Sequence, residues 1–184
     1  MKQGLILIDI QNDYFRGGNM ELVGMEQAAH NAGLLLQKCR GNHLSIIHVQ
    51  HISNHPGGTF FLPNTGGVEI HTSVTPQSGE IIIQKSFPNS FRNTELLSIL
   101  KRSGVEEVVF CGAMSHMCVD ATTRAAFDFG FKCTLIDDAC ATRNLEYKGM
   151  RIEASKVHAA FMAALSFPYA KVVSAHEFIR RQAQ

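Results

Sequence analysis

Short, uniformly apolar runs separated by longer segments are the feature that most constrains how this chain can fold. The run Leu5–Ile8 contains no polar side chain, and neither does the core of the run Val108–Cys111. A strand with one face in water alternates apolar and polar side chains, so these runs indicate strands that are buried on both faces of a parallel sheet. The expected strands are Leu5–Ile8, Leu44–Val49, Ile81–Ile83, Val108–Cys111, Lys132–Ile136 and Val172–Val173.

The segments between these runs are expected to be helices. Gly41 and Gly104 end the first two, and Asn93 caps the start of the second. The expected helices are Met25 to about Arg40, Asn93 or Thr94 to Arg102, Ser115 to about Gly130, Tyr147 to Leu165, and His176 to Arg181. Regular alternation of strand and helix predicts a three-layer α/β fold, with a parallel sheet of about six strands, helices on both faces and right-handed crossovers.

Length and composition agree with one enzyme domain over residues 1–184, long enough to bury a sizeable core. A formal net charge of +1, with acids and bases interspersed, lacks the basic surface typical of proteins that bind nucleic acid or anionic membranes. No apolar run approaches the roughly 20 residues that span a bilayer, and no signal-peptide pattern is present. Five cysteines without paired spacing indicate reduced thiols, no structural disulfide and a cytoplasmic location.

Two charged residues stand at the ends of expected strands. Asp9 follows Leu5–Ile8, and Lys85 closely follows Ile81–Ile83. A carboxylate in this position either faces the crevice where α/β proteins bind ligands or caps the next loop, and Asp13 is available for the capping role. A lone lysine at a strand end is usually solvated, so Lys85 indicates a functional site only together with other reactive residues.

Cys118 is the third candidate, in the turn that follows the fourth expected strand. With Ser115 as the expected N-cap, Cys118 falls in the first turn of a helix, where the helix dipole and free backbone N–H groups favour the thiolate. The alternative is a small buried hydrophobe, which suits the other four cysteines. Three strands that end in an aspartate, a lysine and a cysteine-bearing turn favour a nucleophile at Cys118.

At these residues the chain resembles the isochorismatase-like cysteine hydrolases, the superfamily of nicotinamidases, N-carbamoylsarcosine amidases and ureidoacrylate amidases. The resemblance runs over nearly the whole chain and rests on three motifs, at residues 9–13, 85–94 and 112–124. It implies the strand order 3-2-1-4-5-6 and a homo-oligomer, either a dimer or a tetramer. It also implies a catalytic triad of Asp9, Lys85 and Cys118, a cis peptide between Ala113 and Met114, and an oxyanion hole from the N–H groups of Met114 and Cys118.

These residue types suit the hydrolysis of an amide or ureide of a small molecule. Cys118 would attack the carbonyl carbon and form a thioester, and Asp9 would shuttle the proton. Lys85 would lower the pKa of Cys118 and keep Asp9 ionised. The resemblance favours C–N cleavage, because branches of the family that cleave the isochorismate vinyl ether lack the cysteine.

Three alternatives stay open. One is an isochorismatase-type hydrolase of another bond class, and another is an inactive binding module on the same scaffold. The third is a receiver-like domain that accepts a phosphoryl group on Asp9 and contacts it with Lys85. The last gives Cys118 no role, and Asp13 alone is thin support for the magnesium that such a site needs.

The long segment from His48 to Pro76 is expected to form a loop at the rim of the site or an oligomer contact. Its histidines suggest a metal, but Gln50 stands near the place where nicotinamidase-like members carry an aspartate ligand. We therefore expect no metal and no cofactor. The expected substrate pocket is lined by Gln11, Phe15, Phe60, Phe87 and His116, although each of these side chains also suits a plain structural role.

Overall fold

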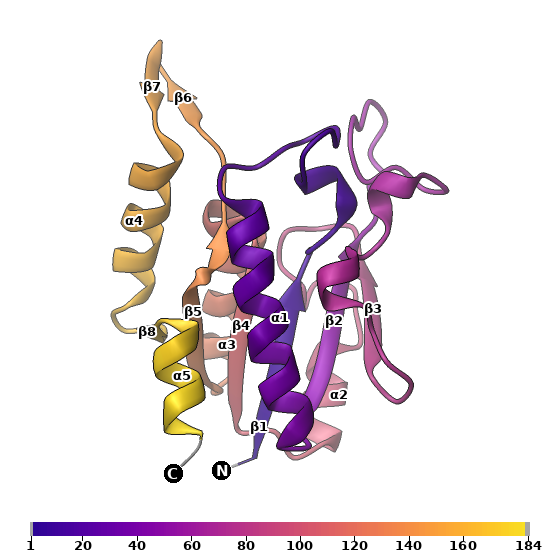
Figure 1. Ribbon diagram of the computed structural model, residues 1–184, viewed down its shortest axis with the longest axis vertical. Helices are drawn as coiled ribbons and strands as arrows, with labels where there is room; N and C mark the ends of the chain where they lie inside the picture. Colours follow the sequence, from indigo (N-terminus) through magenta and orange to yellow (C-terminus); the bar gives the residue numbers. More distant parts are fainter. Residues whose placement is uncertain (1, 183–184) are drawn as a thin grey trace.

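The structure is a computed structural model that describes residues 2–182. Six strands form one parallel sheet in the order β3-β2-β1-β4-β5-β8 (Figure 1). These strands are β1 (Gln3–Ile8), β2 (Ser45–His51), β3 (Ile81–Lys85), β4 (Glu107–Ala113), β5 (Lys132–Ala141) and β8 (Lys171–Val173). Since β8 is the sixth strand of this sheet along the chain, the expected order 3-2-1-4-5-6 is confirmed.

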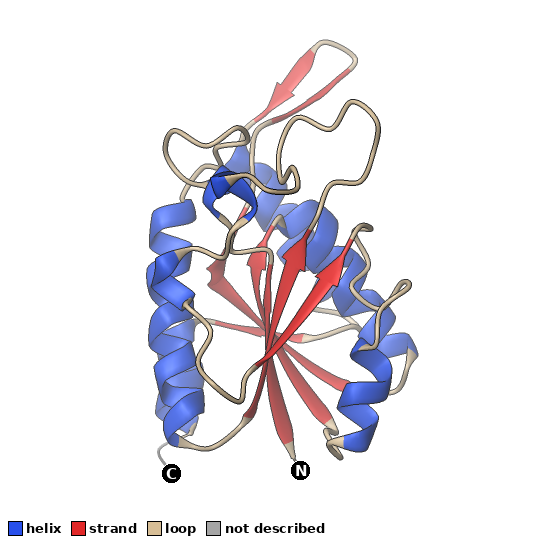
Figure 2. Cartoon of the chain, turned by 90° about the vertical axis from the view of Figure 1, so that its right-hand side faces the viewer, coloured by secondary structure: helices blue, strands red, loops and turns tan. Residues whose placement is uncertain are grey.

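Helices cover both faces of the sheet, as the edge-on view in Figure 2 shows. The α-helices are α1 (Met25–Gly41), α2 (Leu96–Arg102), α3 (Asp120–Asp128), α4 (Ala154–Leu165) and α5 (Ala175–Arg181). Residues of α1 and α5 share one apolar core, and residues of α2, α3 and α4 share the other. The expected three-layer architecture is therefore confirmed. No helix within residues 2–182 is long and apolar enough to cross a membrane.

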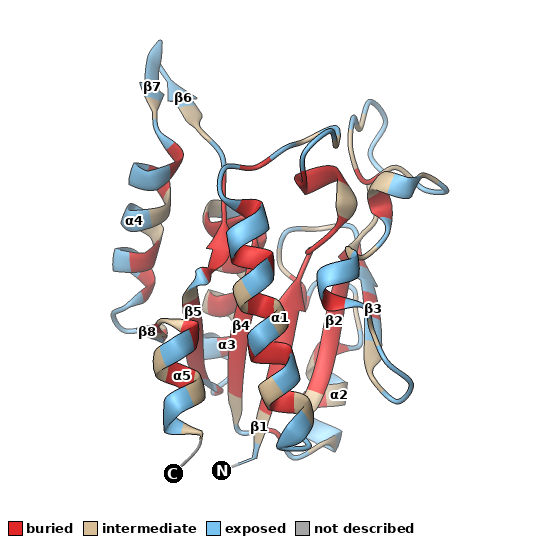
Figure 3. Ribbon diagram, in the orientation of Figure 1, coloured by how far each residue is buried: buried red, intermediate tan, exposed pale blue. Residues whose placement is uncertain are grey.

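The central strand β1 shows why its sequence is apolar throughout. Leu5 and Leu7 pack in the core beneath α1, whereas Ile6 and Ile8 pack in the core on the opposite face. All four side chains are at most 2% exposed, and the central strands are buried along most of their length (Figure 3). Burial of such a side chain contributes roughly 1.5–3 kcal/mol, so a polar residue on either face of β1 would be costly.

The expected helix from Tyr147 to Leu165 is wrong in its first part. A hairpin of β6 (Leu145–Tyr147) and β7 (Met150–Ile152) precedes the helix and projects from the body of the protein (Figures 1 and 3). Lys148 and Gly149 form its two-residue turn with φ values of 51° and 76°, as tight hairpin turns require. The helix α4 then begins at Ala154.

The start of α2 also differs from expectation. Asn93 has a φ of 56° and does not cap the helix. The helix begins at Leu96, whose N–H donates to Thr94 Oγ1 at 3.3 Å. A backbone with positive φ cannot continue into the first helical turn, so the helix starts later than the sequence indicated.

A mostly buried carboxylate joins α1 and β2 to the segment before β3. Glu80 accepts hydrogen bonds from Arg40 (2.6 and 2.9 Å), from His48 Nε2 (2.8 Å) and from the Gln77 N–H (2.9 Å). Burial alone would raise the pKa of Glu80, but these hydrogen bonds lower it to about 2. Burial also lowers the pKa of His48, so its ring is neutral at pH 7 and donates from Nε2.

We predict that Glu80→Gln lowers the free energy of unfolding by about 1–3 kcal/mol at pH 7, because charged hydrogen bonds are lost in a buried site. The folded-state pKa lies below the unfolded value of 4.5. The stabilisation is therefore present above that value and is lost as the pH falls through the folded pKa. Urea unfolding at about pH 7 and about pH 3 measures this, and the gap between variant and wild type should shrink at the lower pH.

The control is Glu177→Gln, which removes an exposed ion pair with Arg181 within α5. This substitution should cost less than about 0.5 kcal/mol. A Glu80→Gln effect no larger than that of the control, or one independent of pH, would contradict the prediction.

Candidate active site

The carboxyl ends of the strands bring the three predicted residues together. Lys85 Nζ lies 2.7 Å from Asp9 Oδ2 and 3.2 Å from Cys118 Sγ. Asp9 is 0% exposed, Lys85 3% and Cys118 4%. An acid, an ammonium group and a thiol that lie far apart in the sequence therefore form one nearly dry cluster.

His51 is a fourth member of this cluster, and its place was not predicted. It ends β2, is paired with Lys85 in the β2–β3 ladder, and places Nδ1 at 3.0 Å from Lys85 Nζ. The three hydrogens of the ammonium group thus face three acceptors, on Asp9, His51 and Cys118. We call these four residues the Lys85 cluster. The expected strand order contained the signal, because it places the end of β2 between the ends of β1 and β3.

The charges in the Lys85 cluster differ from expectation in one respect. Burial would lower the pKa of Lys85, but Asp9 and Cys118 raise it above its usual value, so the side chain is an ammonium ion. Burial raises the pKa of the Cys118 thiol and Asp9 raises it further, which outweighs the lowering effect of Lys85. Lys85 thus lowers the pKa as expected, but the expectation of a thiolate is wrong for the resting site, where the net pKa is raised and Cys118 is a neutral thiol.

Asp9 has one carboxylate oxygen ready to take up a proton. Oδ2 is bound to Lys85, whereas Oδ1 is buried and has no hydrogen-bond partner within residues 2–182. A carboxylate oxygen of Asp9 and the sulfur of Cys118 lie within 4.8 Å of one another. A thiol proton lost from Cys118 therefore has a nearby acceptor.

The backbone holds Asp9 toward the cluster. Its φ of 52° lies in the left-handed region, which few residues other than glycine occupy, and its N–H donates to the Val49 carbonyl oxygen at 3.0 Å. The loop is capped by Asp13, whose carboxylate accepts from the N–H groups of Asn19 (3.1 Å) and Phe61 (2.6 Å). Of the two roles left open for Asp9, capping the loop is thus taken by Asp13, and Asp9 faces Lys85 instead.

The turn before Cys118 is fixed by close backbone approach. Gly112 has a φ of 124°, and a Cβ added there would lie 2.0 Å from the Ile8 carbonyl oxygen, so a side chain cannot be accommodated. The Ala113–Met114 peptide bond is cis. The Met114 carbonyl oxygen accepts from the N–H groups of Met117 (3.0 Å) and Val119 (3.2 Å), which closes the turn.

Ser115 and His116 anchor the same turn to its neighbours. Ser115 is not an N-cap: it opens the π-helical turn η4 (Ser115–Val119), and its hydroxyl lies 2.9 Å from His158 Nδ1 and 3.2 Å from the Ala141 carbonyl oxygen. His116 Nδ1 lies 2.6 Å from Thr142 Oγ1. Burial lowers the pKa of His116, so the ring is neutral at pH 7. His116 was predicted to line the pocket. Its contact with Thr142 shows that the side chain helps to hold the turn.

Gln11, also predicted to line the pocket, supports the site from behind instead. The side chain is fully buried. Its amide donates to the carbonyl oxygens of His51 (2.9 Å) and Val68 (2.7 Å), and its Oε1 accepts from the His51 N–H (2.7 Å). These hydrogen bonds to the backbone occupy the side-chain amide of Gln11. The expectation that Gln11 lines the substrate pocket is therefore wrong.

A cavity of about 270 Å³ adjoins the Lys85 cluster. Phe87, one of the residues predicted to line the substrate pocket, lines this cavity, and His51 connects it to the cluster. Its lining consists of His51, Ser53, Asn54, His55, Pro56, Ser86 and Phe87. Residues 53–56 of this lining belong to the loop that follows β2. This loop is closed at its base, where the Ser53 N–H donates to the Phe61 carbonyl oxygen at 2.9 Å.

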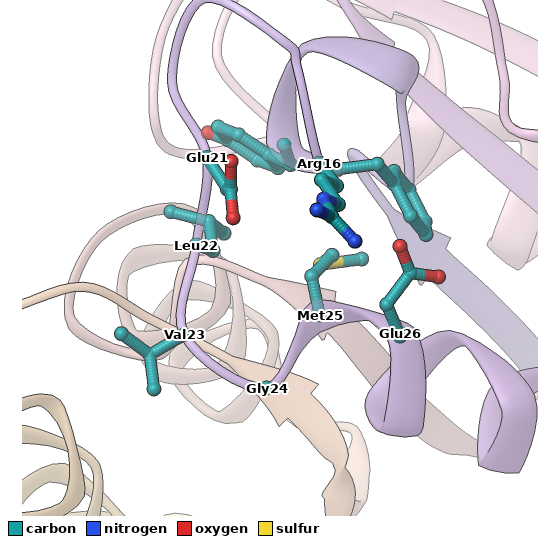
Figure 4. A pocket seen from close by; sticks show the side chains of 9 residues that line it. Arg16, Glu21, Leu22, Val23, Gly24, Met25 and Glu26 are labelled. Carbon is teal, nitrogen blue, oxygen red and sulfur yellow. The ribbon is translucent and has the colours of Figure 1, made fainter.

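Phe15 and Phe60, also predicted to line the pocket, are not among the residues that line this cavity. Phe15 stacks on His71 at 3.5 Å between ring centroids. It lines a separate hollow of about 510 Å³, shown in Figure 4, whose lining includes no member of the Lys85 cluster. Phe60 packs on Phe61 at 5.0 Å and on Tyr14 at 6.0 Å. The structure therefore does not bring Phe15 and Phe60 to the same cavity as Phe87.

Tyr14 is a buried neighbour of the site that was not predicted. It is 1% exposed, and its ring lies 4.5 Å from that of Phe61. Burial raises the pKa of Tyr14, and Cys118 and Asp9 raise it further. The phenol is therefore protonated and lies within the electrostatic field of the cluster. Its sequence position next to Asp13 was the available signal.

Within residues 2–182, one group of three side chains brings potential metal-ligating atoms close together. Asp9, His51 and Cys118 place such atoms within 4.8 Å of one another, whereas His55 is not part of the group. The Lys85 ammonium already stands within 3.2 Å of all three residues. A metal ion would have to displace this buried positive charge, so these residues do not fit a metal while Lys85 is in place.

Comparisons with known proteins agree with one another. The family model described as "Isochorismatase domain" matches residues 3–166. The isochorismatase family protein YddQ of Bacillus subtilis (strain 168) is 48% identical over 180 residues, which cover 98% of this chain and 100% of that protein. The ureidoacrylate amidohydrolase RutB of Caulobacter vibrioides (strain ATCC 19089 / CIP 103742 / CB 15) is 25% identical over 168 residues, which cover 73% of this chain and 75% of that protein.

A solved structure gives the same result. It belongs to an Oleispira antarctica protein assigned to the isochorismatase hydrolases, and it superimposes with a TM-score of 0.94 at 47% sequence identity. The match covers 97% of this chain and 96% of that chain.

We predict that Lys85→Met lowers the free energy of unfolding by about 3–5 kcal/mol at neutral pH, because Asp9 is left as a buried charge without its partner. The double variant Asp9→Asn/Lys85→Met should recover much of this loss, because no buried charge remains. Urea unfolding of the wild type, both single variants and the double variant measures the coupling. Additive losses in the double variant would contradict the prediction.

Proposed function

The chain belongs to the isochorismatase family and is a hydrolase, and from that premise we propose that it cleaves a C–N bond of a small amide or ureide through a thioester on Cys118. The observation that carries the proposal is the contact of one ammonium group with both Asp9 (2.7 Å) and Cys118 Sγ (3.2 Å). The relative RutB, named as an amidohydrolase, supports the bond class.

In the first half-reaction the thiol proton of Cys118 passes to Asp9 while the sulfur attacks the carbonyl carbon of the substrate. Negative charge then develops on the carbonyl oxygen, and the N–H groups of Met114 and Cys118 are proposed to stabilise it. When the C–N bond breaks, the leaving nitrogen takes the proton from Asp9. The amine or ammonia departs, and the acyl group remains on sulfur.

In the second half-reaction water replaces the amine. Asp9 accepts a proton from the water as its oxygen attacks the thioester carbonyl carbon. The C–S bond breaks, the sulfur regains the proton from Asp9, and the product leaves as a carboxylic or carbamic acid. Lys85 stays protonated throughout, and it stabilises the carboxylate before each proton transfer and the sulfur anion during it.

The resting charges favour this sequence of steps. A permanent thiolate beside the Asp9 carboxylate would place two negative charges next to one ammonium group. With a neutral thiol, the pair of Asp9 and Lys85 has no net charge, and the nucleophile forms only as the proton moves. Asp9 Oδ1, which has no hydrogen-bond partner in the described part of the chain, is the proposed acceptor.

The receiver-like alternative has little support. Asp13, the carboxylate available to help hold magnesium, is bound to two backbone N–H groups. Asp9 is fully buried and paired with Lys85, and that mechanism gives the nearby Cys118 no task. A hydrolase of another bond class stays the second candidate and is separated from the first by its products.

We also infer that residues 1–184 form one domain that works in the cytoplasm. All five cysteines are free and buried, which suits a reducing compartment.

We predict that Cys118→Ala reduces hydrolysis by at least about a thousandfold, because the nucleophile is removed. The assay is ammonia release from a panel of small carboxamides, N-carbamoyl compounds and ureides. Cys133→Ala is the matched control, since Cys133 is also a buried free cysteine, and it should leave the rate nearly unchanged. Added chelator should have no effect. Full activity of Cys118→Ala on the best substrate would overturn the proposal.

We further predict a dimer or tetramer in solution, as the family resemblance implies. Size-exclusion chromatography with light scattering measures the molar mass directly. A mass near the 20.3 kDa of one chain would contradict the prediction.

A further inference from the structure

We propose that His51 is a positioning residue whose neutral imidazole holds the Lys85 ammonium group against Cys118, so that protonation of this ring shuts the site down at acid pH. The inference rests on the proposed function, because it gives Lys85 its task beside the nucleophile. It concerns a residue that touches neither the reacting sulfur nor the proton acceptor by a hydrogen bond.

The contact between His51 and Lys85 fixes the tautomer of the ring. Lys85 Nζ lies 3.0 Å from His51 Nδ1. A charged ammonium group has only donors, so Nδ1 must be the acceptor and the ring proton must sit on Nε2. Within residues 2–182 the structure shows no hydrogen bond from Nε2, and the ring lines the cavity beside the cluster.

The ring is held in place from its own backbone. Gln11 binds both the N–H and the carbonyl oxygen of His51, at 2.7 and 2.9 Å. The Phe61 ring packs at 5.9 Å between centroids. A fixed acceptor on one side and Asp9 on the other direct the third ammonium hydrogen toward Cys118 Sγ, so loss of the histidine acceptor frees Lys85 to move away.

Protonation of His51 would remove that acceptor and set two positive charges side by side. The charged or titratable groups that face the ring are Asp9 directly after β1, Lys85 from β3 and Cys118 from η4, and His55 shares its cavity. Burial lowers the pKa of His51, Lys85 lowers it further, and Asp9 opposes both. The ring is therefore neutral at pH 7 and gains its charge only in acid.

The test uses variants that separate the loss of the hydrogen-bond acceptor at position 51 from the protonation of the His51 ring. His51→Asn keeps an oxygen acceptor near the place of Nδ1 but cannot be protonated, whereas His51→Leu removes the acceptor. His30→Asn, on the exposed side of α1, is the matched control. The probe is iodoacetamide, and the measured quantity is the rate of Cys118 alkylation in the full chain by mass spectrometry. No knowledge of the substrate is needed.

We expect His51→Leu to alkylate about tenfold more slowly than the wild type at pH 7, because Lys85 no longer stabilises the forming thiolate. His51→Asn and His30→Asn should stay within about threefold of the wild type. Below pH 6 the wild-type rate should fall more steeply than the roughly tenfold per pH unit of a simple thiol, and His51→Asn should follow the simple slope.

Equal rates for wild type and His51→Leu, equal slowing by Asn and Leu, or the same acid slope in wild type and His51→Asn would each overturn the inference.

Nitrogen-15 NMR of labelled histidine gives a check that does not depend on the folding of any variant, since it uses the wild type at pH 7. The His51 ring should carry its proton on Nε2 alone, and an Nδ1–H or doubly protonated ring would overturn the inference. Failure of the ammonia assay with this alkylation pattern intact would instead reject only the proposed hydrolysis.

Discussion

Lys85 carries its ammonium group where almost no water reaches, and such a charge costs several kcal/mol to bury unless acceptors replace the lost solvent. Asp9, His51 and Cys118 supply those acceptors from three different elements. Each must lie about 3 Å from one nitrogen atom, so the ends of β1, β2 and β3 and the turn after β4 are fixed relative to one another. The order β3-β2-β1-β4 is what makes this possible, because it places these ends side by side.

The sheet could be predicted because its signal is local. Uniformly apolar runs such as Leu5–Ile8 can satisfy both faces only in the middle of a three-layer structure, and the structure shows both faces covered. The hairpin at Leu145–Ile152 was missed because its residues continue the apolar pattern of the following helix. Its decisive feature is the pair of positive φ values at Lys148 and Gly149, which only the glycine indicated.

The candidate site was predictable to a similar depth. Asp9, Lys85 and Cys118 could be found because the first two stand at strand ends and the third lies in the turn that follows β4. His51 also ends a strand, but it begins a loop rich in histidine, glycine and proline, and nothing local separates it from His55. The neutral state of the Cys118 thiol could not be predicted at all, because it depends on burial by segments distant in the sequence.

The loop that follows β2 is joined at its base by the bond between Ser53 and Phe61, and Asp13 holds the same base from another segment. Its tip, residues 54–59, is largely exposed, and part of it walls the small cavity. Residues 54–56 can thus be exchanged without disturbing the anchors beneath, whereas Gly57 has a φ of 86° and a Cβ added at Gly58 would lie 2.3 Å from Ser53 Oγ. Libraries randomised at residues 54–56 would therefore reshape one wall of the cavity while its base stays intact.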